Sequence, residues 1–228
     1  MKTLTCLKIW TKFMPIVKFL ALTNDRIRAI IIWGTITGVF STVVYFGVNE
    51  IASKNTHFYQ LYFEFERAIP MVPWMIYVYQ SFALLITINY FSIKSPQKIK
   101  IYSISLMTSC AIAAVFFILF PAELGFSRVE NIEGYEFMYN TIHAIDRPHN
   151  LAPSLHIAYS GLGAYVLSSE IQSKLLKGMI WIWFLLICSS IVLVHQHHLF
   201  DIFTGAILAL VVKYLIYDKL ISTTNNGT

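Results

Sequence analysis

Charged residues are scarce in this 228-residue sequence, at 13% of the chain, whereas 57% of the residues are hydrophobic. Soluble domains carry about 25% charged residues, so this balance excludes an ordinary soluble domain and indicates a membrane protein. Cysteine is rare too, and its three residues imply no disulfide framework. No cleavable signal peptide is evident, because the basic, apolar residues 1–26 are not followed by a cleavage site; we expect them to form a cytoplasmic amphipathic segment. Internal repeats and low-complexity linkers are also missing, so we expect residues 1–228 to form a single domain.

Six apolar stretches approach the roughly 20 residues that a helix needs to cross a bilayer. They span about 27–48, 69–91, 101–120, 151–168, 175–194 and 199–217. The fourth carries Ser154, His156 and Ser160, and such a polar span is tolerated only inside a bundle. Gly205 and Ala209 form a small-xxx-small pair in the sixth, which lets a neighbouring helix approach closely. The sequence therefore predicts an all-α polytopic membrane protein, a six-transmembrane-helix bundle with the fourth helix at its centre.

Lysine and arginine are unevenly divided between the two ends of these spans. Thirteen of the 17 fall on the side that holds both termini, and the other side has Lys54, Arg67, Arg128 and Arg147. Cytoplasmic loops collect basic residues, so we expect both termini in the cytoplasm and a long loop at 121–150 outside. The net charge of +5 follows this topology and is no sign of a nucleic-acid partner.

Titratable residues gather at the predicted outer face. The stretch "LVHQHHLFDIFTG" at 193–205 holds three histidines and an aspartate, and "RPHNLAPSLH" opens the fourth span from the same side. Ionisable residues at membrane depth are functional by default. His197 and Asp201 are four residues apart, so the carboxylate can fix the imidazole tautomer and leave the other ring nitrogen as a nucleophile or base. His156, from another helix, is expected to supply the complementary acid.

These motifs resemble a known family. "APSLH", followed about 40 residues later by "SIVLVHQHHLFD", resembles the type-2 phosphatidic acid phosphatase superfamily, whose motifs read K-x6-R-P, P-S-G-H and S-R-x5-H-x3-D. "RAIPMVPW" at 67–74, "IDRPHNLAPSLHIA" and "QHHLFDIFTG" look closer to a bacterial branch of membrane-bound phosphatases. That branch is similar to inositol phosphorylceramide and sphingomyelin synthases, and the resemblance covers all six stretches.

The resemblance implies a role for each matching residue. His197, four residues before Asp201, takes the place of the nucleophile, and His156 takes that of the general acid for the leaving oxygen. Ser154 would donate a hydrogen bond to the phosphate. Arg147 would clamp the phosphate through its bidentate guanidinium group. The family needs neither a cofactor nor a metal ion.

The sequence also departs from the family's pattern. Ile191 replaces the arginine of the third motif, Asn140 stands where the first motif has lysine, and Leu155 replaces the glycine of P-S-G-H. A phosphoryl transition state still needs positive charge and hydrogen-bond donors around its equatorial oxygens. The expected sources are Arg147 first, then Arg67 or Arg128, with a protonated His195 or His198 and Asn150 as further candidates.

We therefore expect an integral membrane lipid phosphate phosphatase, which hydrolyses a phosphomonoester or pyrophosphate lipid through a phosphohistidine. Its site would face the periplasm or lumen, and the bacterial resemblance suggests an inner membrane. One alternative is a lipid phosphotransferase that passes a phospho-headgroup to an acceptor alcohol, like a phosphosphingolipid synthase. A second is a transporter or a non-enzymatic lipid-binding protein. A zinc or iron site is a third, because His156, Asp201 and the clustered histidines have that composition. The lipid and the oligomeric state stay open.

Overall fold

The structure is a computed structural model that describes residues 23–129 and 131–226. The amphipathic segment expected at 1–26 lies outside the described residues, apart from residues 23–26. Throughout the described chain the regular elements are helices, accompanied by one isolated bridge between Tyr59 and Ala122. The prediction of an all-α fold is thereby confirmed.

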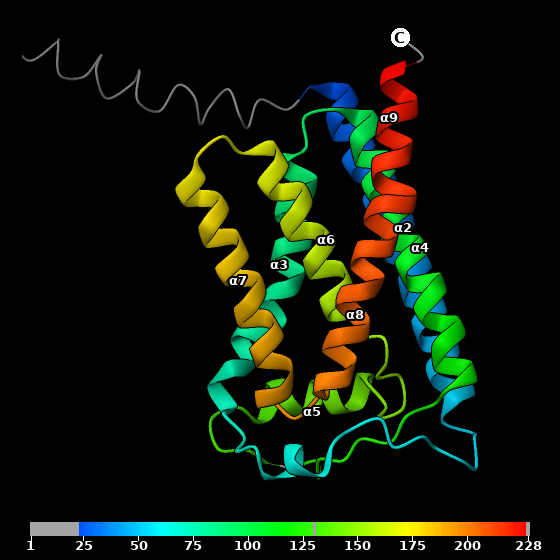
Figure 1. Cartoon of the computed structure of the whole chain (residues 1–228), viewed down its shortest axis with the longest axis vertical. Helices are drawn as coiled ribbons and strands as arrows, with labels where there is room; N and C mark the ends of the chain where they lie inside the picture. Colours follow the sequence, from blue (N-terminus) through cyan, green and yellow to red (C-terminus); the bar gives the residue numbers. More distant parts are fainter. Residues whose placement is uncertain (1–22, 130, 227–228) are drawn as a thin grey trace, which may run out of the picture.

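Six long helical segments of the described chain form a bundle. They are α2 (Asn24–Ala52), α3 (Ile76–Ser92), α4 (Pro96–Leu119), α6 (Leu155–Glu170), α7 (Lys174–Leu193) and α8 (Leu199–Val212), the last continued by the π-helical turn η3 (Lys213–Tyr217) and by α9 (Asp218–Asn226). Figure 1 shows α6 between α3 and α8, with the α2–α4 pair on one flank. The short α5 (Glu136–Ile145) and the small helices η1 (Glu64–Ala68) and η2 (Pro73–Met75) lie at the end opposite the C-terminus.

Four helical segments are long and apolar enough to cross a membrane: Asn24–Ala52, Pro96–Leu119, Lys174–Leu193 and Leu199–Thr224. The length and composition of these four helices indicate a membrane protein. The expected spans at 69–91 and 151–168 are shorter as helices, because α3 has 17 residues and α6 has 16. Four of the six expected spans are thus matched by candidate membrane-spanning helices, whereas the other two, which correspond to the shorter α3 and α6 beside them, stay a prediction.

Proline and serine explain why α3 and α6 begin late. Pro70 and Pro73 interrupt the apolar stretch before α3, and proline lacks the amide proton that a helix interior requires. The chain from Ile69 to Val72 is therefore not helical, and α3 begins only at Ile76. Ser154 is the N-cap of α6, where its side chain accepts a hydrogen bond from the Ile157 N–H. Both late starts leave irregular chain at the outer end of the bundle.

Gly205 brings α8 against the start of α6. A Cβ atom at this position would lie 2.6 Å from the Ser154 carbonyl oxygen and 3.0 Å from the Ile157 Cβ. No side chain fits there, so the expectation that Gly205 permits close helix packing is confirmed. This contact sets the first turn of α6, which carries His156, beside the first turn of α8, which carries Asp201.

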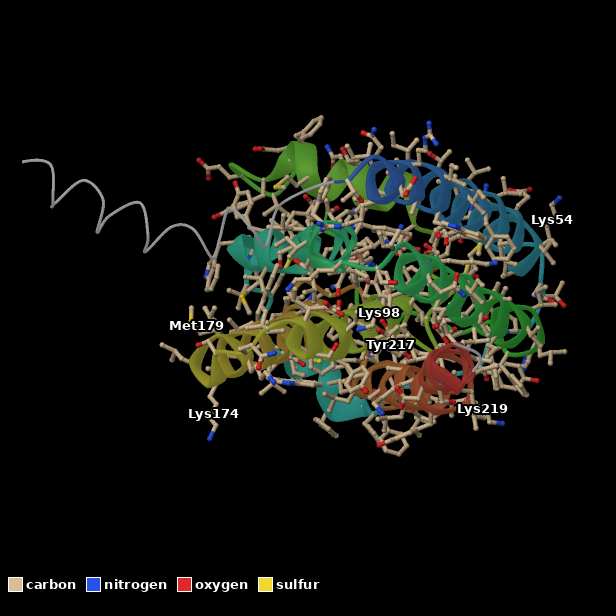
Figure 2. All side chains as sticks on the ribbon, turned by 90° about the horizontal axis from the view of Figure 1, so that it is seen from above. Lys54, Lys98, Lys174, Met179, Tyr217 and Lys219 are labelled. Carbon is tan, nitrogen blue, oxygen red and sulfur yellow. The ribbon has the colours of Figure 1, made fainter. Side chains whose placement is uncertain are left out.

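The flanks of the bundle are apolar and its ends carry the charge. Large apolar side chains of α2, α7 and α8 are exposed, among them Ile31, Val43, Ile182, Leu185 and Phe203. Figure 2 looks onto the end that holds the C-terminus and labels Lys98, Lys174 and Lys219 on α4, α7 and α9. This distribution matches a helical bundle whose sides face hydrocarbon and whose ends face water.

Candidate active site

The turn between α7 and α8 presents the clustered histidines in different directions. The amides of Gln196 and His197 both donate to the Ile191 carbonyl oxygen, at 3.1 and 3.0 Å, which closes the turn. His195 has a φ of 57°, a left-handed conformation that is uncommon for a residue with a side chain. Its Nε2 lies 3.0 Å from the Ile69 carbonyl oxygen, so His195 faces the segment before α3. His197 is left to point into the bundle, where it is 2% exposed.

The three predicted catalytic residues contact one another in series, from Asp201 through His197 to His156. The His197 Nδ1 lies 3.2 Å from Asp201 Oδ2, and the His197 Nε2 lies 3.2 Å from His156 Nδ1. Asp201 is fully buried. With the Nδ1–H donating to the carboxylate, the lone pair of His197 Nε2 is directed toward His156. The structure thus brings together a buried histidine, a carboxylate that orients it and a second imidazole from a different helix.

Ser154 and Asn150 lie on the irregular chain that leads into α6. Ser154 is fully buried, and its backbone N–H donates to the Asp201 carbonyl oxygen at 3.2 Å. Asn150 is 3% exposed, and neither its Oδ1 nor its Nδ2 has a hydrogen-bond partner in the described chain. Buried amides are almost always paired, so Asn150 has unused capacity for a bound group.

The candidate arginines are placed differently from the order that the sequence suggested. Arg147 forms an ion pair with Glu50 at 2.9 Å and a hydrogen bond with Ser53, so its guanidinium is held at the end of α2. Arg67 is exposed and paired with Glu64 in its own turn. Neither contact directs the guanidinium toward His197, so the structure offers no support for Arg147 as the first choice of phosphate clamp.

Arg128 lies on the loop before α5, and its guanidinium group is partly buried. Its two terminal nitrogens donate to the carbonyl oxygens of His143 and Asp146, at 3.2 and 2.5 Å, while its Nε is buried. Burial lowers the pKa of Arg128, and the neighbouring Asp146 opposes that effect. A guanidinium keeps its charge under these conditions. Arg128 is thus a partly desolvated positive charge held by the backbone at the end of α5, next to Asp146.

His198 is held by the protein at both ring nitrogens. Its Nδ1 lies 3.2 Å from Glu66 Oε2, and its Nε2 accepts the Gly125 N–H at 3.0 Å. The ring also stacks on Phe126 and Tyr62. Glycine is needed at 125, since a Cβ there would lie 2.6 Å from the Tyr62 ring. The expected substrate-binding role of His198 is therefore replaced by a structural one, because no ring nitrogen is left for a phosphate.

Glu66 is a site residue that sequence reasoning missed. Its carboxylate is fully buried and accepts hydrogen bonds from the Phe63 and Leu199 amides, at 2.9 and 2.8 Å, besides contacting His198. Glu66 thereby caps the N-terminus of α8, where a negative charge is favourable. Asp201 caps the same turn through the His198 amide at 2.8 Å. The sequence shows only two glutamates that alternate with phenylalanines in "FEFERA", and nothing in it indicates a partner 132 residues away.

Acidification is expected to destabilise the fold through His198. Burial lowers the pKa of His198, against the opposing charges of Asp201 and Glu66. The unfolded imidazole has a pKa of about 6.5. Between the two values the unfolded state binds more protons, so the free energy of unfolding falls as the pH drops below about 6.5. Thermal unfolding in detergent at about pH 7.5 and about pH 5.5 measures this loss.

His198→Gln is the variant that tests this pH dependence. Its amide can form hydrogen bonds with both Glu66 and the Gly125 N–H, and it does not titrate. On acidification this variant should lose less stability than the parent. It should still lose some, because burial lowers the pKa of His195 as well. His57→Gln, at an exposed position, should behave like the parent. Parental pH dependence in His198→Gln would contradict the assignment.

A cavity of about 380 Å³ adjoins the catalytic histidines. It lies among α2, α3, α4, α5 and α6, and its lining includes His156 and Asp146. The His156 ring packs against Tyr79 and Phe82, both at a centroid distance of 4.6 Å, and both also line the cavity. His156 therefore lies between His197 and an open cavity that is large enough to hold part of a substrate.

The described residues contain no group of three or more histidine, cysteine, aspartate or glutamate side chains arranged to hold a metal ion. Both nitrogens of His197 and both of His198 are instead directed at protein partners. The clustered histidines accordingly do not converge in the way that the zinc or iron alternative requires.

Comparison with known families gives one match: residues 130–221 match the model of the PAP2 superfamily. The match includes α5 to α8 and therefore His156, His197 and Asp201. No curated protein matches the chain significantly.

Proposed function

Since this chain belongs to the PAP2 superfamily, we propose that it is a membrane-bound phosphoric ester hydrolase that acts on a lipid phosphate through a phosphohistidine at His197. The observation that carries the proposal is the buried line of contacts from Asp201 through His197 to His156. It supplies an oriented nucleophile and an acid–base partner from separate helices. A two-step displacement at phosphorus requires at least these two groups.

The proposed setting is a bundle of six membrane crossings with the histidines at the outer end. The four apolar spans flank α3 and α6, which are largely shielded by neighbouring helices and can cross within the bundle. The basic residues of the described chain are concentrated at the opposite end, which favours a cytoplasmic location for that end. A bacterial inner membrane, with the site facing the periplasm, fits this arrangement.

In the first step, His197 Nε2 attacks phosphorus and the ester oxygen leaves. Asp201 holds the Nδ1–H and stabilises the imidazolium that forms, while His156 donates a proton to the leaving oxygen. In the ligand-free structure the attacking nitrogen faces His156 Nδ1 at 3.2 Å. The phosphoryl group must therefore enter between the two rings and replace that hydrogen bond.

In the second step, water attacks the phosphohistidine. His156, now deprotonated, accepts a proton from the water, the new P–O bond forms and the bond from phosphorus to His197 Nε2 breaks. The products of this step are inorganic phosphate and the regenerated enzyme; with a pyrophosphate lipid, the lipid monophosphate has already left in the first step. Ser154 and Asn150 are the proposed hydrogen-bond donors to the phosphate oxygens, Asn150 through an amide that has no other partner in the described chain.

Arg128 is the proposed source of positive charge, ahead of Arg147 and Arg67. Replacing Arg128 by alanine should lower kcat by about 10²- to 10³-fold, the loss typical of one group that stabilises transition-state charge. Arg147→Ala and Arg67→Ala are the matched controls and should each change kcat by less than about threefold, because surface ion pairs contribute little. Steady-state kinetics on the three variants measures the difference. A larger loss in Arg147→Ala than in Arg128→Ala would reverse the assignment.

Phosphate release from a panel of lipid phosphates, in detergent and with EDTA, tests the proposed function. The panel should contain phosphatidic acid, phosphatidylglycerophosphate, undecaprenyl pyrophosphate and a lipid A phosphate. We expect release from at least one lipid, undiminished by EDTA, because no step of the mechanism uses a metal ion. Loss of activity with EDTA, restored by added zinc or iron, would overturn the metal-independent mechanism.

Two other functions remain as outcomes of the same assay. A transporter or lipid-binding protein would release no phosphate, and its binding of the lipid would be unchanged in His197→Ala. A lipid phosphotransferase would form the phosphoenzyme but release phosphate slowly until an acceptor alcohol is added.

A further inference from the structure

Asp146 is a carboxylate beside the site that the hydrolytic mechanism does not use. It is the C-cap of α5, and its Oδ1 accepts a hydrogen bond from the Tyr45 hydroxyl group of α2. The other carboxylate oxygen, Oδ2, accepts no hydrogen bond from the described chain. The side chain lines the same cavity as His156. One oxygen of this carboxylate is therefore available to a group that enters the cavity.

The lining of the cavity favours a positively charged group. Phenylalanine and tyrosine rings form much of it, and the electron-rich face of such a ring attracts a cation. Among the described lining residues there is no lysine or arginine, so His156 is the one side chain there that can carry positive charge. The Asp146 carboxylate would repel a phosphate, and a neutral group would leave its charge unbalanced. The rings belong to Tyr45, Phe46, Tyr79, Phe82 and Tyr159.

Arg128 does not supply the missing positive charge in the cavity. Its guanidinium binds the backbone carbonyl oxygens of His143 and Asp146, and Arg128 is not among the lining residues. Burial raises the pKa of the Asp146 carboxyl, although the hydrogen bond from Tyr45 and two neighbouring basic groups act in the opposite direction. A carboxyl group with a raised pKa has a poorly compensated anion, so a cation beside Oδ2 would stabilise it.

Tyr79 links this carboxylate to the proposed general acid. The centroid of its ring lies 4.6 Å from that of the His156 ring, and its hydroxyl group is close enough to Asp146 for an electrostatic interaction. The ester oxygen that leaves in the first step must lie beside His156, which protonates it. Because one tyrosine side chain spans both groups, a few bonds are enough to separate that oxygen from a cation at Asp146.

The rim of the cavity indicates that the cation arrives on an amphiphile. Phe46 of α2 and Ile145 of α5 line the cavity and are 46% and 47% exposed. Phe46 continues the exposed apolar surface of α2, which includes Val39 and Val43 and belongs to a candidate membrane-spanning helix. A free hydrated amine would lose its water at such an opening, whereas an amphiphile can leave its hydrocarbon chain there.

We propose that Asp146 and the surrounding aromatic rings bind an ammonium group on the leaving alcohol, so that the preferred substrate is an amphiphilic phosphate ester with an amine close to the ester oxygen. The proposal rests on the proposed function, because attack by His197 defines the leaving alcohol. Two sources share this chemistry. The amine can lie on the lipid chain of a phosphomonoester or on a small amino-alcohol headgroup of a phosphodiester.

The same bonds change with either source. In the first step the bond from phosphorus to His197 Nε2 forms, the bond to the oxygen of the amino alcohol breaks, and His156 gives that oxygen a proton. Water then releases inorganic phosphate from the monoester, or a lipid phosphate from the diester. The ammonium group stays protonated throughout and takes part only through its charge.

Removing the charge of the amine tests the proposal. The purified protein in detergent is given 2-aminohexadecyl phosphate, its N-acetyl derivative or hexadecyl phosphate, and kcat/KM is measured from phosphate release. We expect kcat/KM to be about tenfold lower, or less still, for the two uncharged alcohols, as when a hydrogen bond to a charged group is lost. Asp146→Asn should abolish the preference by slowing the reaction of the amine alone.

A pair of diesters separates the two sources. Hexadecyl 2-aminoethyl phosphate and its N-acetyl derivative carry the nitrogen on the headgroup, and their common product, hexadecyl phosphate, is quantified. A preference for the amine among the monoesters alone places it on the lipid chain of the substrate. A preference among the diesters alone places it on the headgroup. Preference in neither pair overturns the ammonium site.

Three further variants keep the test decisive. Asp218→Asn is the matched control, because Asp218 also accepts a tyrosine hydroxyl hydrogen bond, at 3.2 Å from Tyr165, but on α9 at the other end of the bundle. It should retain the preference. Thr141→Lys adds a cation to the cavity from its α5 wall and should slow the amine more than its N-acetyl derivative, whereas Thr141→Gln, the control for size, should slow both alike. The Thr141 variants answer the question even if Asp146→Asn fails to fold.

The failures can be told apart. Equal phosphate release from the amine and its N-acetyl derivative would overturn the ammonium site and leave the proposed hydrolase intact. If no ester turns over and no phosphoenzyme forms, the proposed function fails, and binding of the amino alcohol alone tests the site. 2-Aminohexadecanol should then raise the Tm of the parent protein more than its N-acetyl derivative does, and Asp146→Asn should remove the difference. Equal stabilisation by both alcohols would overturn the site.

Discussion

Replacement of His197 by alanine is expected to abolish turnover, lowering kcat/KM by about 10⁴-fold or more. The reason is that no other group can take over the attack. His195 and His198 are directed at backbone and carboxylate partners, and the nitrogen of His156 that faces the site lies on the far side of the phosphoryl position. Loss of the nucleophile removes the covalent route altogether, and a general acid alone recovers little of it.

The measurement for His197→Ala is both kinetic and chemical. The parent protein, quenched during turnover of a ³²P-labelled lipid phosphate, should carry label that is stable in alkali and lost in acid, as a phosphohistidine is. His197→Ala should carry none. His57→Ala, an exposed histidine on the outer loop, is the matched control and should retain parental label and rate. Labelled protein in the His197→Ala sample would mean that the nucleophile is another residue.

The catalytic core of the site was predictable because its residues lie near elements that the sequence places well. His197 and Asp201 are four residues apart, and the end of one predicted span and the start of the next fix them at a common depth. His156 opens a span from the same side, so topology alone brings it near them. The structure adds the distances and the role of Gly205, which sets the two helix starts in contact.

The supporting residues were predictable only in part, because irregular chain supplies them: Arg128 was a candidate cation, whereas Glu66 and Asp146 were not expected at the site. The segments between spans supply Glu66, Arg128 and Asp146. For such segments hydropathy predicts the side of the membrane, but it does not predict where the side chains lie. Their contacts join residues that are far apart in the sequence, as in the Glu66–His198 pair and the Tyr45–Asp146 hydrogen bond. The ends of α3 and α6 were misplaced for a related reason, since the prolines and the Ser154 cap shorten helices within apolar stretches that remain continuous in composition.

The departures from the family motifs acquire a physical meaning in the structure. Position 191, where the third motif has arginine, is a fully buried isoleucine in the apolar core beneath the histidine turn. Position 140, where the first motif would have lysine, is an exposed asparagine on α5. Neither position supplies charge here. Arg128, a partly buried arginine on the loop before α5, is the proposed replacement, and it lies outside the residues that match the family.

Replacement of His156 by alanine should have the second-largest effect, and its size should depend on the leaving group. With a lipid alcohol as leaving group, loss of the general acid should lower kcat/KM by about 10²- to 10⁴-fold. With an aryl phosphate, whose phenolate leaves without a proton, the first step should be nearly unaffected. The second step still needs His156 as a base, so the phosphoenzyme should accumulate.

His156→Asn separates acid–base chemistry from packing. Its amide can keep a hydrogen bond to His197 Nε2 and partly fill the space between Tyr79 and Phe82, but it cannot donate or accept a proton as an imidazole does. If proton transfer is the role of His156, the asparagine and alanine variants should behave alike, with a burst of aryl alcohol followed by slow phosphate release. Full activity of His156→Asn on a lipid phosphate would mean that His156 only positions His197. In that case the proton for the leaving oxygen must come from elsewhere in the cavity, and Asp146, the carboxylate of its lining, becomes the next residue to replace.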